Sequence, residues 1–206
     1  MSEPTQLFLL RHAEVETRYH RIFGGRIDMN ISDRGHEQAA ALAKYLKAKS
    51  FDAIYASPMK RVQQTLAPFA AGRAPAPVTL EGLREVNFGD WTGLSWEQVK
   101  EKFGISAFQW LAQLDRAAIP NAESGAMFRE RVEPCVQQIL RAHVGQKVAV
   151  VCHGGTIRMI LSVLLAMPFV QTSAFEIEYA SLTQVRCAPD KSEIQLLNFT
   201  PWRDLP

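Results

Sequence analysis

The sequence is poor in cysteine and in net charge. Its 206 residues include only three cysteines, at positions 135, 152 and 187, and no C-x-x-C pair. This spacing argues against a disulfide framework and against a zinc ribbon. The 23 Lys and Arg residues nearly balance 21 Asp and Glu, which leaves a formal net charge of +2. A large nucleic-acid surface needs a dense basic face, so we expect no nucleic-acid partner, although this balance is compatible with a small anion pocket.

Long hydrophobic runs are absent as well. The most apolar stretch, residues 159–167, is too short to span a bilayer. Only four consecutive apolar residues precede Arg11, fewer than the apolar core of a secretory signal requires. We therefore expect a cytoplasmic protein with no membrane partner. The 47% apolar and 21% charged residues are typical of a soluble globule, and the length predicts a single domain over residues 1–206.

Strand and helix patterns alternate along the chain. Apolar and β-branched runs predict strands over residues 6–10, 52–56, 78–80, 147–152, 175–179, 182–187 and 193–199. Capped amphipathic segments predict helices over 32–49, 58–69, 124–144 and 156–167, with Ser32, Ser57 and Ser124 as N-caps. Residues 86–123 predict an irregular helical insertion. The alternation predicts an α/β fold, a three-layer α/β/α sandwich with a mixed, mostly parallel central sheet.

Two of the five histidines directly follow predicted strands. His12 comes after Arg11 at the end of the first strand, and His153 follows the strand 147–152. In open α/β sheets, ligands bind beyond the carboxyl ends of the strands. We therefore expect both imidazoles to face one crevice.

Groups suited to an anion accompany these histidines. Gly154 opens a helix whose free N–H groups and positive dipole end favour negative charge. Arg11 supplies a guanidinium fork that matches phosphate. Arg61 belongs to the helix after the second strand and is expected to point to the same place. The sequence thus predicts a small cationic pocket for a phosphate group.

Five short segments strengthen this interpretation. They are Leu10-Arg11-His12-Ala13-Glu14, Ser32-Asp33-Arg34-Gly35 with Gln38-Ala39, Ser57-Pro58 with Arg61 and Gln64-Thr65, Glu85 with Phe88-Gly89-Asp90-Trp91 and Gly93, and Val151 with His153-Gly154-Gly155. In order and spacing they resemble the motifs of the histidine phosphatase (phosphoglycerate-mutase-like) superfamily. The Phe-Gly-Asp-Trp segment, residues 120–124 and the length are most similar to the α-ribazole phosphatase and broad-specificity phosphatase branch.

The resemblance implies a metal-independent phosphomonoester hydrolase with no cofactor, acting through a phosphohistidine intermediate. His12 would be the nucleophile, while Arg11, Arg61 and a protonated His153 would hold the phosphoryl oxygens. Glu85 would protonate the leaving oxygen and then activate water. The implied partner is a small-molecule phosphate ester, with α-ribazole 5'-phosphate of cobalamin biosynthesis as a candidate. The protein would be a monomer or a homodimer.

Further positions are assigned by the same resemblance. Gly24 and Gly25 would line the substrate with backbone N–H groups, and Gly154 would face it from the helix start. Arg18 stands where many family members have a substrate-contacting asparagine. Arg18 would then bind a second anion, unless it is simply solvated. The aromatic residues Trp91, Trp96, Phe108 and Trp110 are expected in the core, with capping of the pocket as the alternative.

Three rival interpretations remain open. The first is phosphoglycerate-mutase-type phosphoryl transfer. It is disfavoured because the chain lacks the Tyr- and Lys-bearing segment that mutases carry after the catalytic glutamate, and has no Arg-Arg dipeptide. The second is a cysteine phosphatase, because Cys152 and Arg158 form a C-x5-R string after a strand. That interpretation leaves Arg11, His12 and Arg61 unexplained. The third is a phospho-ligand binding protein without catalysis.

Overall fold

The computed structural model describes residues 3–71 and 75–205. Its strands are β1 (Thr5–Arg11), β2 (Ala53–Ala56), β3 (Val78–Thr79), β4 (Lys147–Cys152), β5 (Leu182–Cys187) and β6 (Ser192–Phe199). Within the described residues they form one six-stranded sheet in the order β3-β2-β4-β1-β5-β6. The outermost residues of the domain predicted over 1–206 lie outside the described ranges, so the domain limits stay a prediction.

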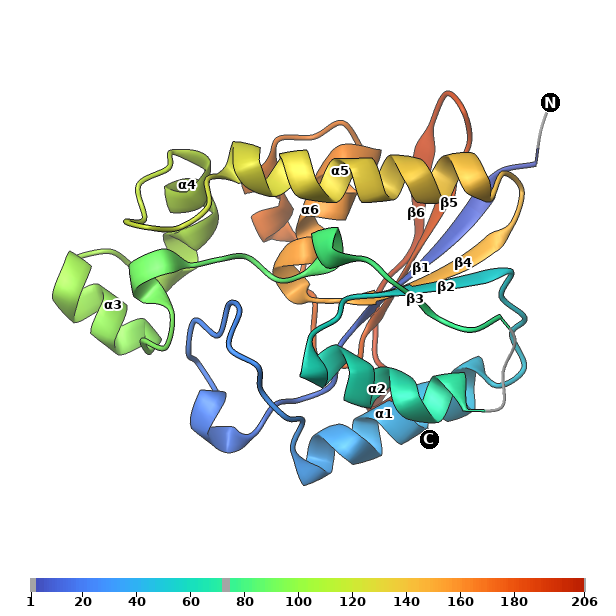
Figure 1. The fold of residues 1–206 in the computed structure, drawn as a ribbon, viewed down its shortest axis with the longest axis horizontal. Coiled ribbons are helices and arrows are strands. Elements are labelled where there is room, and N and C mark those ends of the chain that lie inside the picture. The colour runs from blue at the N-terminus through green and yellow to red at the C-terminus, as the bar shows by residue number, and fades with distance from the viewer. Residues whose placement is uncertain (1–2, 72–74, 206) are drawn as a thin grey trace.

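Most neighbouring strands run parallel. β4 pairs in parallel with β1 and β2, and β2 pairs in parallel with β3. β5 and β6 extend the sheet antiparallel from β1. Figure 1 shows helices on both faces of this sheet. The predicted three-layer α/β/α sandwich with a mixed, mostly parallel sheet is therefore confirmed.

Two groups of helices cover the two faces (Figure 1). One face carries α1 (Asp33–Leu46) and α2 (Lys60–Ala70), and the other carries α5 (Gly125–Ala142) and α6 (Gly154–Leu164). The short α7 (Pro201–Asp204) contacts α1. The predicted insertion holds α3 (Trp96–Phe103) and α4 (Trp110–Asp115). Short 3-10 turns are η1 (Thr17–Tyr19), η2 (Glu81–Leu83), η3 (Gly89–Trp91), η4 (Ala107–Gln109) and η5 (Phe169–Ala174).

The core divides into two clusters because successive strand residues point to opposite faces. Leu9 of β1 packs toward α5 and α6, and Leu10 packs toward α1 and α2. On β4, Cys152 belongs to the first cluster and Val151 to the second. β4 is buried from residue 148 to 152, as expected of a central strand covered on both faces.

Predicted caps explain where two helices begin. Ser32 accepts a hydrogen bond from the Gly35 N–H at 3.0 Å at the start of α1. Ser124 accepts one from the Met127 N–H at 3.1 Å at the start of α5. Each cap satisfies one of the free N–H groups in the first helical turn. Both N-cap predictions are confirmed.

Two local predictions are wrong. The helix expected from residue 58 begins at Lys60 with Met59 as its N-cap, so Ser57 is free for another contact. Residues 175–179 form no strand. The edge of β1 that such a strand would need is taken by β5, and this segment instead accepts a hydrogen bond from Arg11 at the Ile177 carbonyl. Among residues 3–71 and 75–205, no helix combines the length and apolar character needed to cross a membrane.

Candidate active site

The two histidines meet because their strands are neighbours. β1 and β4 are paired in parallel with Arg11 opposite Cys152. His12 and His153 therefore leave the sheet at the same edge, and the His12 N–H donates to the Cys152 carbonyl at 3.0 Å. Their ring centroids lie 5.2 Å apart. The structure thus places both imidazoles at the crevice that the sequence predicts.

His12 has one ring nitrogen available for chemistry. Its Nδ1 lies 2.8 Å from the Ala13 carbonyl, which only accepts, so Nδ1 carries the proton. Nε2 is then unprotonated and accepts from Arg61 Nε at 3.2 Å. Burial, followed by the charges of Arg61 and Arg11, holds the pKa of His12 well below its usual value. The imidazole is therefore neutral, as a nucleophile must be.

His153 is neutral as well, whereas the resemblance implies a protonated His153 when it holds the phosphoryl oxygens. Its Nδ1 accepts from Arg61 Nε at 3.2 Å, and its Nε2 donates to the Ser57 hydroxyl at 2.8 Å. Burial, then the charges of Arg61 and His12, lowers the pKa of His153 well below its usual value. A bound phosphate would reverse this balance, because an adjacent negative charge favours the imidazolium.

The two terminal nitrogens of the Arg61 guanidinium are held by backbone carbonyls. Its Nη1 donates to the Ile27 carbonyl at 2.8 Å and its Nη2 to the Gly25 carbonyl at 2.9 Å. Burial lowers the pKa of Arg61 to about 10, so it stays charged at neutral pH. Gly24 and Gly25 line the cavity. The contact that the structure shows at Gly25 is through its carbonyl to Arg61, in contrast to the N–H lining that the resemblance implies.

Arg11 has a hydrogen-bond donor, its Nε, that no described residue uses. Its Nη1 donates to the Ile177 carbonyl at 2.5 Å, and its guanidinium lies 4.1 Å from the centre of the Tyr179 ring. Arg11 Nε is buried and, among the described residues, has no hydrogen-bond partner. A Cβ added at Gly154 would lie 3.4 Å from this nitrogen. Gly154 therefore leaves room beside Arg11 at the start of α6, where an anion is favoured.

Glu85 sits against the same helix start. Its carboxylate accepts from the Gly155 N–H at 3.1 Å and from the Val86 N–H at 3.0 Å. A Cβ at Gly155 would come within 2.5 Å of Glu85 Oε1, so only glycine allows this approach. Phe88 lines the cavity beside Glu85, whereas Trp91 is fully buried in the core. The structure therefore brings Glu85 to the cavity that holds His12.

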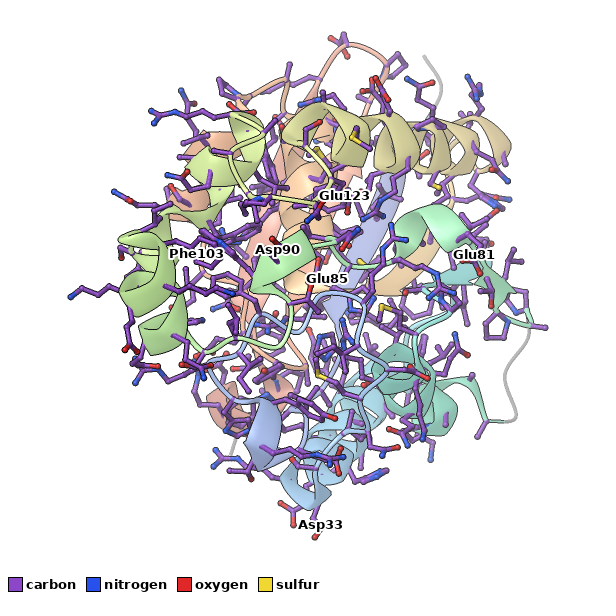
Figure 2. The ribbon with its side chains drawn as sticks, turned by 60° about the vertical axis from the view of Figure 1, so that its left-hand side comes forward. Asp33, Glu81, Glu85, Asp90, Phe103 and Glu123 are labelled. Atoms are coloured by element: carbon purple, nitrogen blue, oxygen red, sulfur yellow. The ribbon has the colours of Figure 1, made fainter. Side chains whose placement is uncertain are left out.

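An ion pair that is not predicted from the sequence holds the Glu85 segment. The Arg131 guanidinium donates to both oxygens of Glu123, at 2.7 and 2.8 Å, and to the Glu85 carbonyl at 2.9 Å. Glu123 also accepts from the Asn87 N–H at 2.7 Å. Figure 2 shows Glu85 and Glu123 close together near the middle of the molecule. The segment 120–124 contains Glu123, but its sequence does not reveal the partner Arg131 or the contact with the Glu85 segment, which is distant in the chain.

Arg18 is not brought to the site. It lies in η1, does not line the cavity, and pairs with Glu16 at 3.1 Å on the surface. Of the two alternatives the sequence left open, the structure shows the solvated charge.

The cavity is larger than a phosphate group requires. Its volume is about 480 Å3. Six of its aromatic lining residues are here named the aromatic wall: Tyr19, Phe23, Phe88, Trp96, Phe108 and Trp110. Phe108 is 78% exposed and its ring centroid lies 5.2 Å from that of Trp96. The leaving group of a substrate therefore has an apolar surface to contact, while Trp91 belongs to the core.

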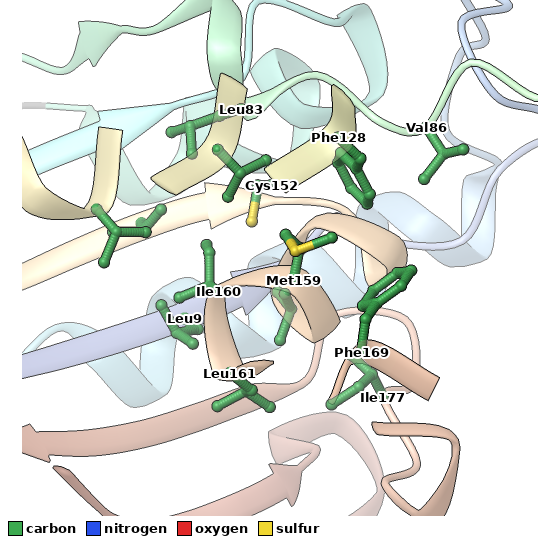
Figure 3. Close-up of a cluster of buried hydrophobic side chains, with 14 of the residues drawn as sticks. Leu9, Leu83, Val86, Phe128, Cys152, Met159, Ile160, Leu161, Phe169 and Ile177 are labelled. Atoms are coloured by element: carbon green, nitrogen blue, oxygen red, sulfur yellow. The ribbon is translucent and has the colours of Figure 1, made fainter. Parts of the chain in front are cut away.

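Cys152 is unsuited to the rival cysteine mechanism. Figure 3 shows its sulfur among Leu83, Met159 and Ile160 in the hydrophobic cluster. The side chain is fully buried, and burial raises the pKa of the thiol. It does not line the cavity. A thiol nucleophile needs a lowered pKa and access to substrate, so the structure contradicts this interpretation.

Metal-ligating side chains are not clustered in the described part of the chain. Within the residues that the structure describes, no group of three or more His, Cys, Asp and Glu side chains is placed to hold a metal ion. The fixed positive charges that face the cavity are guanidinium groups. Arg11, Arg61 and Arg158 supply them.

Known proteins are similar to this chain in sequence and fold. The model of the histidine phosphatase superfamily (branch 1) matches residues 7–200. The chain belongs to this superfamily. Phosphoserine phosphatase 1 of Hydrogenobacter thermophilus is 29% identical over 95% of this chain and 92% of its own length. The adenosylcobalamin/alpha-ribazole phosphatase of Salmonella typhimurium is 24% identical over 94% of this chain and 96% of its own length.

The fold of this chain is similar to that of a solved structure. The mycobacterial glucosyl-3-phosphoglycerate phosphatase superimposes with a TM-score of 0.87 at 23% identity, covering 95% of this chain and 99% of the other. The expectation of a histidine phosphatase, and hence of an enzyme that removes phosphate groups, is confirmed.

Proposed function

We propose that this histidine phosphatase hydrolyses phosphate monoesters of small metabolites through a phosphohistidine on His12. One observation carries the proposal. His12 presents an unprotonated Nε2 toward the same point as Arg61 and His153, beside the unused Nε donor of Arg11. A phosphoryl group at this point would meet a nucleophile and fixed positive charge together.

The reaction follows in two displacements. The His12 Nε2 lone pair forms a bond to phosphorus as the bond from phosphorus to the ester oxygen breaks, and Glu85 gives that oxygen a proton. Water then attacks the phosphohistidine, its proton passes to Glu85, and the bond between nitrogen and phosphorus breaks. Arg11, Arg61 and His153 neutralise the phosphoryl oxygens in both steps.

The cavity and the names of the relatives suggest two candidate substrates. The aromatic wall supports a leaving group with a planar apolar part, and α-ribazole 5'-phosphate has such a part. The Salmonella relative is named for this ester and the Hydrogenobacter relative for phosphoserine. Both esters are candidates under this proposal. A cytoplasmic location and a monomeric or homodimeric state remain predictions.

The test is hydrolysis of p-nitrophenyl phosphate in excess EDTA. We expect turnover by the wild type and by Cys152→Ser, loss of at least about a thousandfold in His12→Ala, and an acid-labile, alkali-stable phosphoenzyme in the wild type. A dead Cys152→Ser variant with an active His12→Ala variant would refute the assignment. Phosphate binding without turnover would indicate a binding protein, and transfer of the phosphoryl group to an added phosphoglycerate rather than to water would indicate a mutase.

A further inference from the structure

Two opposite charges face the catalytic cavity without meeting each other. Arg158 on α6 and Glu176, just after η5, both line it. Among the described residues, neither forms an ion pair, and no ion-pair contact joins them within 4.0 Å. We name Arg158 and Glu176 the charged wall. It lies in the same cavity as the aromatic wall, but it would bind charged ligand groups, whereas the aromatic wall would contact apolar ones.

Arg158 is held in place by the backbone. Its Nη1 donates to the Thr172 carbonyl of η5, and the side chain is half-buried. A carbonyl satisfies one donor and leaves the positive charge without a counterion. Glu176 is exposed and accepts no hydrogen bond from the described residues. Each group would gain from a ligand of opposite charge, since charge-assisted hydrogen bonds exceed neutral ones.

The charged wall lines the same cavity as the phosphate-binding groups. Burial lowers the pKa of Arg158, the charge of Arg11 lowers it further, and Glu85 and Glu176 act in the opposite direction. Arg158 therefore lies within electrostatic reach of both the phosphate-binding Arg11 and the proton donor Glu85. Arg158, Glu85 and Arg11 also line one cavity of about 480 Å3, so a ligand group bound to Arg158 would share that cavity with the ester oxygen that Glu85 protonates.

We propose that the leaving group is a short α-amino acid, with its carboxylate on Arg158 and its ammonium on Glu176. This inference rests on the proposed function and names its substrate class, an O-phospho-α-amino acid such as O-phospho-L-serine. Only a ligand with both charges satisfies both residues. The leaving group of α-ribazole 5'-phosphate has neither charge, so it would use the aromatic wall and leave Arg158 and Glu176 unpaired.

The test compares kcat/KM for four esters. O-Phospho-L-serine carries both charges, O-phosphoethanolamine lacks the carboxylate, 3-phosphoglycerate has a hydroxyl in place of the ammonium, and α-ribazole 5'-phosphate lacks both groups. We expect O-phospho-L-serine to exceed each of the others by about 10- to 100-fold, since each missing charge leaves one wall residue without its partner.

Two variants assign the charges separately. Glu176→Gln should lower the ratio of kcat/KM for O-phospho-L-serine over 3-phosphoglycerate by at least about tenfold. Arg158→Gln should do the same to the ratio for O-phospho-L-serine over O-phosphoethanolamine. Glu178→Gln is the matched control, because Glu178 lies on the same segment outside the cavity and pairs with Arg203. It should leave both ratios unchanged.

The outcomes separate this inference from the proposed function. Absence of turnover for every ester, together with absence of a phosphoenzyme, would refute both. Turnover with a phosphoenzyme, but with α-ribazole 5'-phosphate preferred or with both ratios unchanged in the variants, would refute the role of the charged wall in substrate choice. The proposed function would then stand. A preference for O-phospho-L-serine that is lost selectively in each variant would support it.

Discussion

Acidification tests the protonation states of the two active-site histidines. Both are buried, and burial with the nearby Arg61 charge holds the pKa of each well below its usual value. In the unfolded chain a histidine takes up a proton near pH 6.5, whereas these two stay neutral when folded. The unfolded state therefore binds more protons as the pH falls, and the folded protein loses stability.

The size of the effect follows from this difference. Between about pH 7.5 and about pH 5.5, each such histidine costs about 1.4 kcal/mol of the free energy of unfolding, which gives about 2.7 kcal/mol for the pair. The loss begins near the unfolded pKa and continues until the pH reaches the folded values. Ordinary carboxylates titrate lower, so they contribute little in this window.

Urea unfolding at several pH values in a phosphate-free buffer measures the loss. The comparison is with the double variant His12→Asn and His153→Gln, whose side chains do not titrate. We expect its free energy of unfolding to fall by about 2.7 kcal/mol less than that of the wild type. His36→Asn, at an exposed position of α1, is the control for the exchange itself. If wild type and double variant respond equally to pH, the histidines are not neutral in the folded protein and the argument for a neutral nucleophile fails.

Three further predictions rest on other contacts. Phe128→Ala should lower the free energy of unfolding by about 3–5 kcal/mol, because Phe128 is fully buried. Phe108→Ala, at a 78% exposed position, should change it by less than about 0.5 kcal/mol. Equal effects of the two substitutions in urea unfolding would contradict this difference in packing. The Cys152 thiol should not react with Ellman's reagent until the protein unfolds, and rapid modification of the native protein would show that it is accessible. Ser57→Ala should lower kcat by about tenfold and alter its pH profile, because the Ser57 hydroxyl accepts a hydrogen bond from His153 Nε2–H. Ser57→Thr should restore activity, and an unchanged pH profile would exclude this role.

The strands and the candidate phosphate-binding residues were predictable because their signals are local. Hydrophobic runs with β-branched residues mark β1 and β4, and His12 and His153 stand directly after them. Parallel neighbours end at the same edge of a sheet, so the meeting of the two histidines follows once these strands are paired. The caps at Ser32 and Ser124 were equally local, since each involves an N–H three residues away.

The predictions that failed depended on groups distant in the chain. Ser57 has the sequence of an N-cap, yet its hydroxyl serves His153, which lies 96 residues away. Residues 175–179 have the composition of a strand, but β5 already occupies the edge beside β1. Propensity describes what a segment prefers alone, whereas the sheet order decides which edges and partners remain.

Local pattern therefore determined most of the elements and singled out His12, His153, Arg11 and Arg61 as candidate site residues, because periodicity and motif spacing are properties of neighbouring residues. Tertiary structure alone decided that Cys152 points into the core, that Arg131 holds the Glu85 segment through Glu123, and that Arg158 and Glu176 share a cavity. These outcomes depend on which strand face, helix and loop are brought together across the fold. Burial and electrostatic surroundings, and with them the protonation of His12 and His153, arise only from that assembly.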